Sequence, residues 1–552
     1  MDDDRTSLDA MLHARTIVPR WKSPHSAVEG LHFDKARLRP RARIGDAWIQ
    51  RLSKRYGQFP SPHLANELYE TASLYGLIGD LPNAVLQQAA DHRGSTSVRA
   101  KPPEIYDGIS SQRESNSVEV HEQASRAEIH RLRRILARNS DRPFCWSELA
   151  RHYLIVAEQG KAIRSMQVAL QLAKANRYLY RAATRLFVHV HEPERALSLL
   201  HSAAAIRTDP ALLAAEIAAS STIKRNSRFI GVAQGLLASD HFTSGQLSEL
   251  AAAVGTVELI NGATKRARQR FHESLVAPTE NSLAQAQWAT EQDRKIVIPA
   301  AAWTTPDSHE ALALARRQDR DWATVLRFCA AWLAEEPFSS RAAMMGSFVG
   351  FRPEHNAAAE QFASAGLRCD SGHVGLLNNR AVARAYLGRT SEAYSDVREA
   401  TRHDTGRNSA ALLATLGLIA FRSGMPDLGR EFYERSIAWL TASKDHTSVA
   451  RALIYLAREE IRSDPARTAS SIELAHRVAK SQYAYRQPEI LGMSELVIEE
   501  AERAASTERT FPANEAGLPA SADDFRHQAA LFRTPKNIQS GWTRIPDFSR
   551  LI

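Results

Sequence analysis

The amino-acid sequence predicts an all-α fold in which short helical hairpins follow one another as a repeating array. Nearly every periodic segment spaces its apolar residues at the 3.6-residue period of a helix, and Ala, Leu, Arg and Glu dominate these segments. Alternating runs of Val, Ile and Thr are scarce, and "KIVIPAA", around Ile296, is the single short candidate for a strand. Similar hairpins also recur at intervals near 34 residues, which is typical of helical repeats.

One such hairpin is expected in the stretch "LLNNRAVARAYLGRTSEAYSDVREA", residues 376–400. A first helix is predicted at about 374–387, and Gly388 ends it because glycine tolerates the left-handed turn that closes a helix. A second helix is predicted from about Ser391 to His403. Small residues are expected where the two helices approach closely, at Ala381, Ala393 and Ala400.

An early position of the second helix recurs along the chain. Steps of 34 residues back from Ala393 reach Ala359 and Val325, and a step of 36 residues forward reaches Gly429. The N-terminal half repeats the pattern in steps of 34, 34 and 37 residues, at Ala162, Ala196, Ile230 and Ala267. A hairpin of this length cannot bury its own apolar face, so neighbouring hairpins are expected to stack around one continuous core.

These hairpins resemble the tetratricopeptide repeat, a 34-residue helix–turn–helix unit with the pattern W-x2-L-G-x2-Y, then A-x3-F and often P. The stretch from Trp146 supplies Trp146, Leu149, Ala150, Tyr153, Ala162 and Met166. The resemblance covers about residues 61–92 and 126–482. It implies a solenoid that coils into a right-handed superhelix, with a concave groove of the kind in which tetratricopeptide proteins hold peptides.

Breaks in the repeat period predict how the chain is organised. Residues 93–125 are polar and lack an apolar helical face, residues 278–306 interrupt the register, and residues 507–552 have no sustained period. The expected segments are a basic N-terminal segment (1–60), a first hairpin (61–92), a flexible linker or loop (93–125), an N-terminal array (126–277), an insert or hinge (278–306), a C-terminal array (307–482), a capping helix (483–506) and a C-terminal tail (507–552).

Composition and the start of the chain favour a cytoplasmic protein. Cys145, Cys329 and Cys369 are too widely spaced for a disulfide framework or a paired metal site, which fits a reducing compartment. The start "MDDDRTSLDAML" is acidic and lacks the apolar core of a signal peptide, and apolar runs such as "ALLAAEIAA" are too short to span a membrane. The net charge of +9 is mild and permits, without requiring, contact with nucleic acid.

No motif in the sequence names a reaction. P-loop, dinucleotide-binding, zinc-protease, hydrolase, kinase and EF-hand patterns are all missing. "HVHEPE", residues 189–194, places two histidines at i and i+2, which point to different faces of a helix and so make poor joint ligands. A non-enzymatic protein without a cofactor or a metal is therefore expected.

Candidate binding residues follow from the first helix of each hairpin, which would line the concave groove. Arg181 and Arg185 are four residues apart and share a helix face, where they would offer forks for carboxylate or phosphate groups. The competing interpretation pairs these arginines with acids of neighbouring helices or leaves them simply solvated. The full set of predicted groove residues is Arg151, Tyr178, Arg181, Arg185, His189, Asn378 and Tyr386.

The stretch "FDKARLRPRARIGDAWIQRLSKRYG" is a second candidate site because it is strongly basic. It could contact phosphates of a nucleic acid, dock on an acidic protein surface, or simply remain solvated. The residues expected to make such contacts are Arg37, Arg39, Arg41, Arg43, Arg51, Lys54 and Arg55.

Two functions remain open from the sequence. The leading hypothesis is a scaffold or adaptor that holds a partner protein or peptide in the groove, as a sensor or regulator of a bacterial effector complex. The alternative is a helical-repeat protein that binds RNA through the basic segment and the groove arginines. The sequence also allows a homo-oligomer, and it gives no reason to expect a membrane partner.

Overall fold

The structure is a computed structural model, and its described residues are helical or irregular. The described residues are 18–22, 46–58, 60, 65, 68–69, 72, 81–88, 115–174, 176–349, 352–506 and 521–532. Within these ranges no strand occurs, and the stretch around Ile296 is irregular chain before a short 3-10 helix, η2 (Ala300–Thr304). The all-α prediction is confirmed for this part of the protein.

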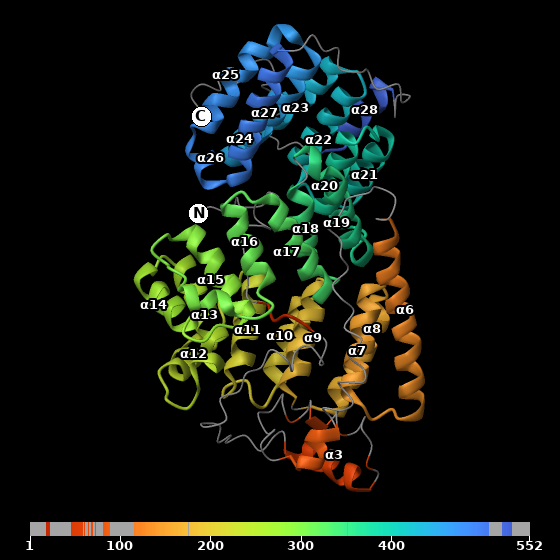
Figure 1. Ribbon diagram of the computed structural model, residues 1–552, viewed down its shortest axis with the longest axis vertical. Coiled ribbons are helices and arrows are strands. Elements are labelled where there is room, and N and C mark those ends of the chain that lie inside the picture. Colours follow the sequence, from red (N-terminus) through yellow and green to blue (C-terminus); the bar gives the residue numbers. More distant parts are fainter. Residues whose placement is uncertain are drawn as a thin grey trace. The chain divides into compact units, whose positions relative to one another are not determined.

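The chain divides into two compact units. Among the described residues, the N-terminal unit comprises 18–311 with 334–336, and the C-terminal unit comprises 312–333 with 337–532. Each unit is a succession of helices, labelled along the chain in Figure 1.

Helices of the N-terminal unit pack mainly on their near neighbours in sequence. They are α3 (Asp46–Gln58), α6 (Ser115–Arg138), α7 (Pro143–Ile155), α8 (Gln159–Leu172), α9 (Arg177–His189), α10 (Pro193–Ser202), α11 (Pro210–Thr222), α12 (Ile230–Leu237), α13 (Ser244–Ile260), α14 (Thr264–Ser274) and α15 (Glu280–Gln292). The pairs α7–α8, α9–α10 and α13–α14 form hairpins, and α7, α9, α11, α13 and α15 each contact the next member of that row.

Two helices, α16 (His309–Gln318) and α17 (Trp322–Glu335), connect the units along the chain. The other C-terminal helices are α18 (Ser340–Phe348), η4 (Pro353–His355), α19 (Asn356–Cys369), α20 (Val374–Tyr386), α21 (Thr390–His403), α22 (Ser409–Arg422), α23 (Pro426–Ala442), α24 (His446–Ser463), η5 (Pro465–Arg467), α25 (Thr468–Ala479), α26 (Gln482–Arg486), α27 (Pro488–Ser506) and α28 (Ala522–Ala530). Here α18–α19, α20–α21 and α22–α23 pair, and α18, α20, α22 and α24 form the row of alternate helices.

The hairpin expected at 376–400 is present as α20 and α21. Its helices end and begin within one residue of the predicted positions, and the turn between them contains Gly388 with φ of 80°. Three small residues are fully buried where α20 and α21 pack, namely Ala381, Ala393 and Ala400. A larger side chain at these positions would force the two helices apart.

A residue in the left-handed conformation recurs in the turn that follows several of the helices. In the N-terminal unit these residues follow α7, α9, α11 and α13, at Ala157, His191, Lys224 and Gly262. In the C-terminal unit they follow α16, α20 and α22, at Arg320, Gly388 and Gly424. The next residue donates its N–H to the carbonyl five positions earlier, as Arg389 does to Arg384 at 2.9 Å. This helix-closing motif therefore repeats even where the sequence lacks glycine.

Replacing Gly388 with alanine is expected to destabilise the C-terminal unit by about 1 kcal/mol, because a Cβ atom disfavours φ of 80°. Chemical denaturation followed by circular dichroism measures the change. The matched control is Gly235→Ala inside α12, where an added Cβ meets nothing within 4 Å. There alanine should stabilise the helix by up to about 1 kcal/mol. Equal effects of the two substitutions would contradict the assigned turn geometry.

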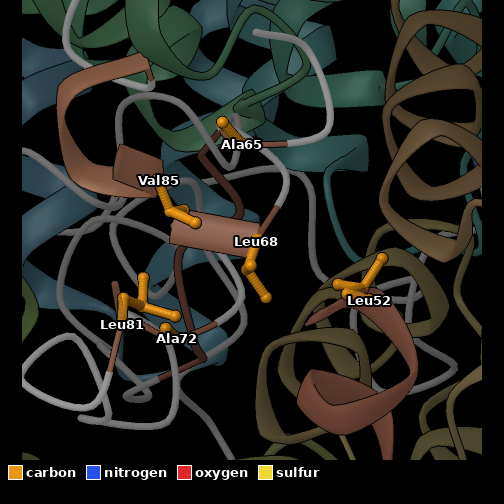
Figure 2. Packing of buried hydrophobic residues seen from close by; sticks show 6 residues of the cluster. All are labelled: Leu52, Ala65, Leu68, Ala72, Leu81 and Val85. Atoms are coloured by element: carbon orange, nitrogen blue, oxygen red, sulfur yellow. The ribbon is translucent and has the colours of Figure 1, made fainter. Parts of the chain in front are cut away.

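The first predicted hairpin shares a small core with α3. Leu52 of α3 is buried in one cluster with apolar residues from the predicted first hairpin, which Figure 2 labels as Ala65, Leu68, Ala72, Leu81 and Val85. Tyr56 of α3 adds a hydrogen bond, since its hydroxyl donates to Gln88 Oε1 at 3.0 Å. The C-terminal end of the predicted basic segment is therefore part of a packed cluster.

The segment 278–306, which was expected to be an insert or a hinge, is largely helical. Residues 280–292 form α15, which packs on α13 and buries Leu283 and Trp288. Polar side chains that are also buried, including Gln285, obscured its apolar period in the sequence. The two compact units divide between residues 311 and 337.

Helices also lie inside two other predicted segments. The polar linker was expected to reach residue 125, but α6 begins at Ser115, while 93–114 lie outside the described residues. The tail at 507–552 contains α28, which contacts α22. Its Phe525 ring lies 4.8 Å from the Tyr394 ring, centroid to centroid. Because α28 is short, it leaves no sustained period in the sequence.

Candidate functional site

A short irregular segment of the chain, Val18–Pro19–Arg20–Trp21–Lys22, lies against helices of the N-terminal unit. It is called the VPRWK segment below, and Figure 1 shows it as a short red stretch beside α9. Proline fixes its own φ and lacks an N–H donor, which favours an extended chain over a helix here. Trp21 is fully buried and Lys22 is 8% exposed, so the segment is deeply seated.

Side chains from three separate places hold the backbone of this segment. The Tyr178 hydroxyl of α9 donates to the Lys22 carbonyl at 2.8 Å, and the Asn281 amide of α15 donates to the Val18 carbonyl at 3.5 Å. The Trp21 N–H donates to Oε1 of Glu336 at 3.4 Å. Contacts of this kind recognise an extended main chain whatever its side chains are.

The two basic side chains of the segment enter a group of carboxylates. Arg20 binds Glu310 at 3.1 Å and lies 3.7 Å from Glu335. The Lys22 ammonium lies 3.1 Å from Asp307, 3.5 Å from Glu280 and 3.6 Å from Glu335. The surface that receives the segment is called the acceptor face. It consists of Tyr178, Glu280, Asn281, Asp307, Glu310, Glu335 and Glu336.

The acceptor face is a paired electrostatic system. Burial alone would raise the pKa of the Glu336 carboxyl, but Arg185, whose Nε lies 2.8 Å away, and Arg20 outweigh burial and lower it. Burial alone would lower the pKa of Lys22, but Glu280, Glu335 and Asp307 raise it above its usual value. Both pKa shifts favour the charged forms, the Glu336 carboxylate and the Lys22 ammonium. At neutral pH the segment is therefore positively charged and is surrounded by carboxylates.

Two carboxylates of the acceptor face, together with the adjacent His309, have the composition of a metal site. Ligand atoms of Asp307, His309 and Glu335 lie within 4.8 Å of one another, a set that suits a divalent cation. Two of these residues, Asp307 and Glu335, bind the Lys22 ammonium in the structure. A cationic side chain therefore occupies the position where the carboxylates would attract a metal ion.

Two of the predicted groove residues belong to this site. Tyr178 binds the segment directly, and Arg185 orients Glu336, which binds Trp21. The other predicted arginines are ion-paired: Arg181 lies 2.8 Å from Glu249, and Arg151 lies 3.5 Å from Glu148. Each of these arginines therefore has an acidic partner, which for Arg151 lies on its own helix, α7.

The remaining N-terminal groove residue, His189, is buried at the end of α9, where it is 8% exposed.

Burial raises the pKa of Tyr178 well above its usual value, so its hydroxyl stays a hydrogen-bond donor at any ordinary pH. Tyr178 is also packed edge-on against Phe144 of α7, with ring centroids 5.8 Å apart. This packing fixes the direction of the hydroxyl.

The two predicted groove residues of the C-terminal unit lie in different surroundings. Asn378 accepts a hydrogen bond from Thr415 at 2.7 Å and lines a cavity of about 130 Å³ that α18, α20, α22, α23 and α24 enclose. Tyr386 lies instead against the guanidinium groups of Arg422 and Arg458, at 4.9 and 4.6 Å from its ring centroid. Tyr386 is thus part of an internal ionic cluster, while Asn378 borders an accessible space.

The basic N-terminal stretch is described only in part. Arg37, Arg39, Arg41 and Arg43 lie outside the described residues, and so does the side chain of Arg51. Lys54 is exposed on α3, and Arg55 is ion-paired with Asp141 at 3.0 Å. Contact with nucleic acid through this stretch stays a prediction.

Sequence reasoning missed the VPRWK segment and the acids that receive it. The available signal was a tryptophan between two cations, next to a proline, in a stretch without helical period. The adjacent acids Glu335 and Glu336 gave a second signal at the end of a helical run. Nothing in the local sequence joins these two stretches, which are more than 300 residues apart.

Replacing Tyr178 with phenylalanine is expected to raise the opening of the VPRWK segment about fivefold, since one hydrogen bond contributes about 1 kcal/mol. Trypsin cleavage at Arg20 measures opening, because a buried segment resists the protease. Tyr180→Phe, on the same helix, is the matched control and should leave the rate unchanged. Equal rates for both variants would remove the Tyr178 hydroxyl from the site.

No family model matches the sequence, and no curated protein matches it either. Among the described helices, none combines the length and the apolar character that crossing a membrane requires.

Proposed function

We propose that this protein is a tetratricopeptide-like helical solenoid that acts as a non-enzymatic scaffold. Its N-terminal unit binds an extended segment of a partner protein on the acceptor face. The resemblance in sequence period and the packing of alternate helices support the solenoid. The recurrence of left-handed turn residues, as at Ala157 and His191, supports it independently of side-chain identity.

The observation that carries the proposal is the seated VPRWK segment. The acceptor face provides main-chain contacts, a buried position for an indole ring and carboxylates for two cations. A surface that holds one irregular segment by its main chain has the chemistry needed to hold another. The paired state of Arg181 and Arg185 favours a peptide over a phosphate backbone, because those arginines are already neutralised.

Site-specific photo-crosslinking tests this function. A photoreactive amino acid at position 307, at the edge of the acceptor face, should form an adduct with one partner polypeptide in cells. The control position is Arg266, on α14, whose side chain is 70% exposed and does not belong to the acceptor face. Adducts at 307 that map only to the chain itself, under every growth condition, would count against the scaffold.

A further inference from the structure

We propose that the acceptor face selects partner segments with a cation–tryptophan–cation sequence, and that the VPRWK segment is a built-in competitor for them. This inference rests on the proposed scaffold function and names the chemistry of its partner. The occupant in question is a polypeptide of another protein, with an extended Arg-Trp-Lys-like stretch. The chain's own segment shows which groups such a stretch must bring.

The indole ring is the first requirement. Trp21 is 0% exposed although it belongs to a segment with no regular structure of its own. Its burial therefore depends entirely on the surrounding helices. Large aromatic side chains with few rotatable bonds are the usual anchors of short peptide segments. A partner without this ring would leave the position unfilled and lose most of the apolar contact.

Positive charge on both sides of the ring is the second requirement. Glu310 and Glu336 are each only 3% exposed, and Glu280, Asp307 and Glu335 lie beside them. Arg20 and Lys22 supply two of the cations that face these acids. A segment that left without replacement would leave buried carboxylates short of positive charge, which is strongly unfavourable. An acidic or purely apolar partner would meet the same penalty.

The main-chain contacts set the conformation of the partner without restricting its sequence. Tyr178 and Asn281 each donate to a carbonyl of the segment, and Glu336 accepts from one of its N–H groups. These groups exist in every polypeptide except at proline nitrogen. Selectivity therefore comes from the Arg20, Trp21 and Lys22 positions, while the backbone contacts fix direction and register.

A segment on the same chain has an advantage over a partner in solution. Tethering gives the segment an effective concentration on the order of millimolar. If the segment and a free peptide both bind the empty face with a Kd of about 10 μM, the segment raises the apparent Kd of the free peptide about 100-fold. The VPRWK segment would thus keep weak or non-matching partners off the acceptor face. A partner displaces the VPRWK segment when it makes additional contacts outside the five positions that the two segments share.

The test uses the full-length chain and a labelled synthetic peptide, TIVPRWKSP, which copies residues 16–24. Fluorescence anisotropy measures its Kd for the wild type and for the triple variant Arg20→Ala, Trp21→Ala, Lys22→Ala. The variant is expected to bind at least about 10-fold more tightly than the wild type, because the internal competitor is removed. A peptide with alanine in place of tryptophan, and one with glutamate in place of both cations, should not bind either protein.

A second variant covers the case in which the triple variant fails to fold. Lys22→Glu keeps the tryptophan but places a carboxylate among Asp307, Glu280 and Glu335, so it should also expose the face to the peptide. Circular dichroism checks that each variant is folded. Adding Tyr178→Phe to the variant should weaken peptide binding several-fold, which places the peptide on the acceptor face.

Three results would overturn the inference. Folded variants that bind the peptide no more tightly than the wild type would make the segment a structural element only. Equal binding of the glutamate peptide would remove the charge requirement. A wild-type dimer that dissociates on addition of the peptide would assign the face to a second copy of the chain. In each case a crosslinked partner at position 307 would still support the scaffold function, so the two proposals fail separately.

Discussion

Replacing Trp21 with alanine is expected to release the VPRWK segment and to raise trypsin cleavage at Arg20 by at least about 100-fold. Trp21 is fully buried, and truncating a buried tryptophan costs about 3–5 kcal/mol. Because the segment is irregular, the loss should appear as local opening before it appears as global unfolding. Cleavage is followed by mass spectrometry under native conditions, where its rate reports the open population.

The control for this substitution is Val297→Ala, a change to an apolar side chain that is 75% exposed in the same unit. It should leave both the cleavage rate and the melting temperature unchanged. A Trp21→Ala protein that unfolds globally, with Arg20 cleaved no faster than other sites, would show that the ring stabilises the whole unit. Unchanged cleavage would contradict the seated position of the segment altogether.

Replacing Arg458 with alanine is expected to destabilise the C-terminal unit by about 3–5 kcal/mol, the usual cost of breaking a buried ion pair by removing one partner. The side chain of Arg458 is 1% exposed, binds Glu500 at 2.7 Å and stacks on the Tyr386 ring. The substitution leaves Glu500 with Arg462, at 2.9 Å, and removes the stacking cation. Chemical denaturation at pH 7 measures the loss.

The same ion pair gives a pH dependence with a definite sign. Burial alone would raise the pKa of the Glu500 carboxyl, but Arg458 and Arg462 lower it from 4.5 to about 2. A depressed folded-state pKa contributes stability that is present above pH 4.5 and is lost as the pH falls toward 2. A shift of this size corresponds to about 3 kcal/mol. Glu500→Gln should therefore destabilise the protein at pH 7 and make little difference near pH 2.

A surface pair of the same chemical type provides the control. Arg503 lies 3.4 Å from Glu499, with side chains 71% and 53% exposed. Arg503→Ala should change the free energy of unfolding by less than about 1 kcal/mol, because exposed ion pairs contribute little. If Arg458→Ala and Arg503→Ala had equal effects, the buried cluster around Tyr386 would not have the role assigned to it.

The hairpins could be predicted from the sequence because their determinants are local. The apolar period of 374–403 and Gly388 place two helices and the turn between them without reference to the rest of the chain. Local reasoning failed at α15, whose buried polar residues hide the period, and at α28, which is too short to show one. It also left open whether Arg181 and Arg185 are available or paired, because the acids that neutralise them are distant in sequence.

The sequence by itself determined that this protein is built from helices that pack on their neighbours, since helical periodicity and small packing residues depend on positions a few residues apart. Only the tertiary structure decided what the N-terminal unit holds. Trp21 meets Glu336 across 315 positions, Arg20 meets Glu310 across 290, and Lys22 meets Asp307 across 285. No local period encodes such pairings. They arise because buried carboxylates require nearby cations, and folding places Arg20 and Lys22 of the same chain beside them.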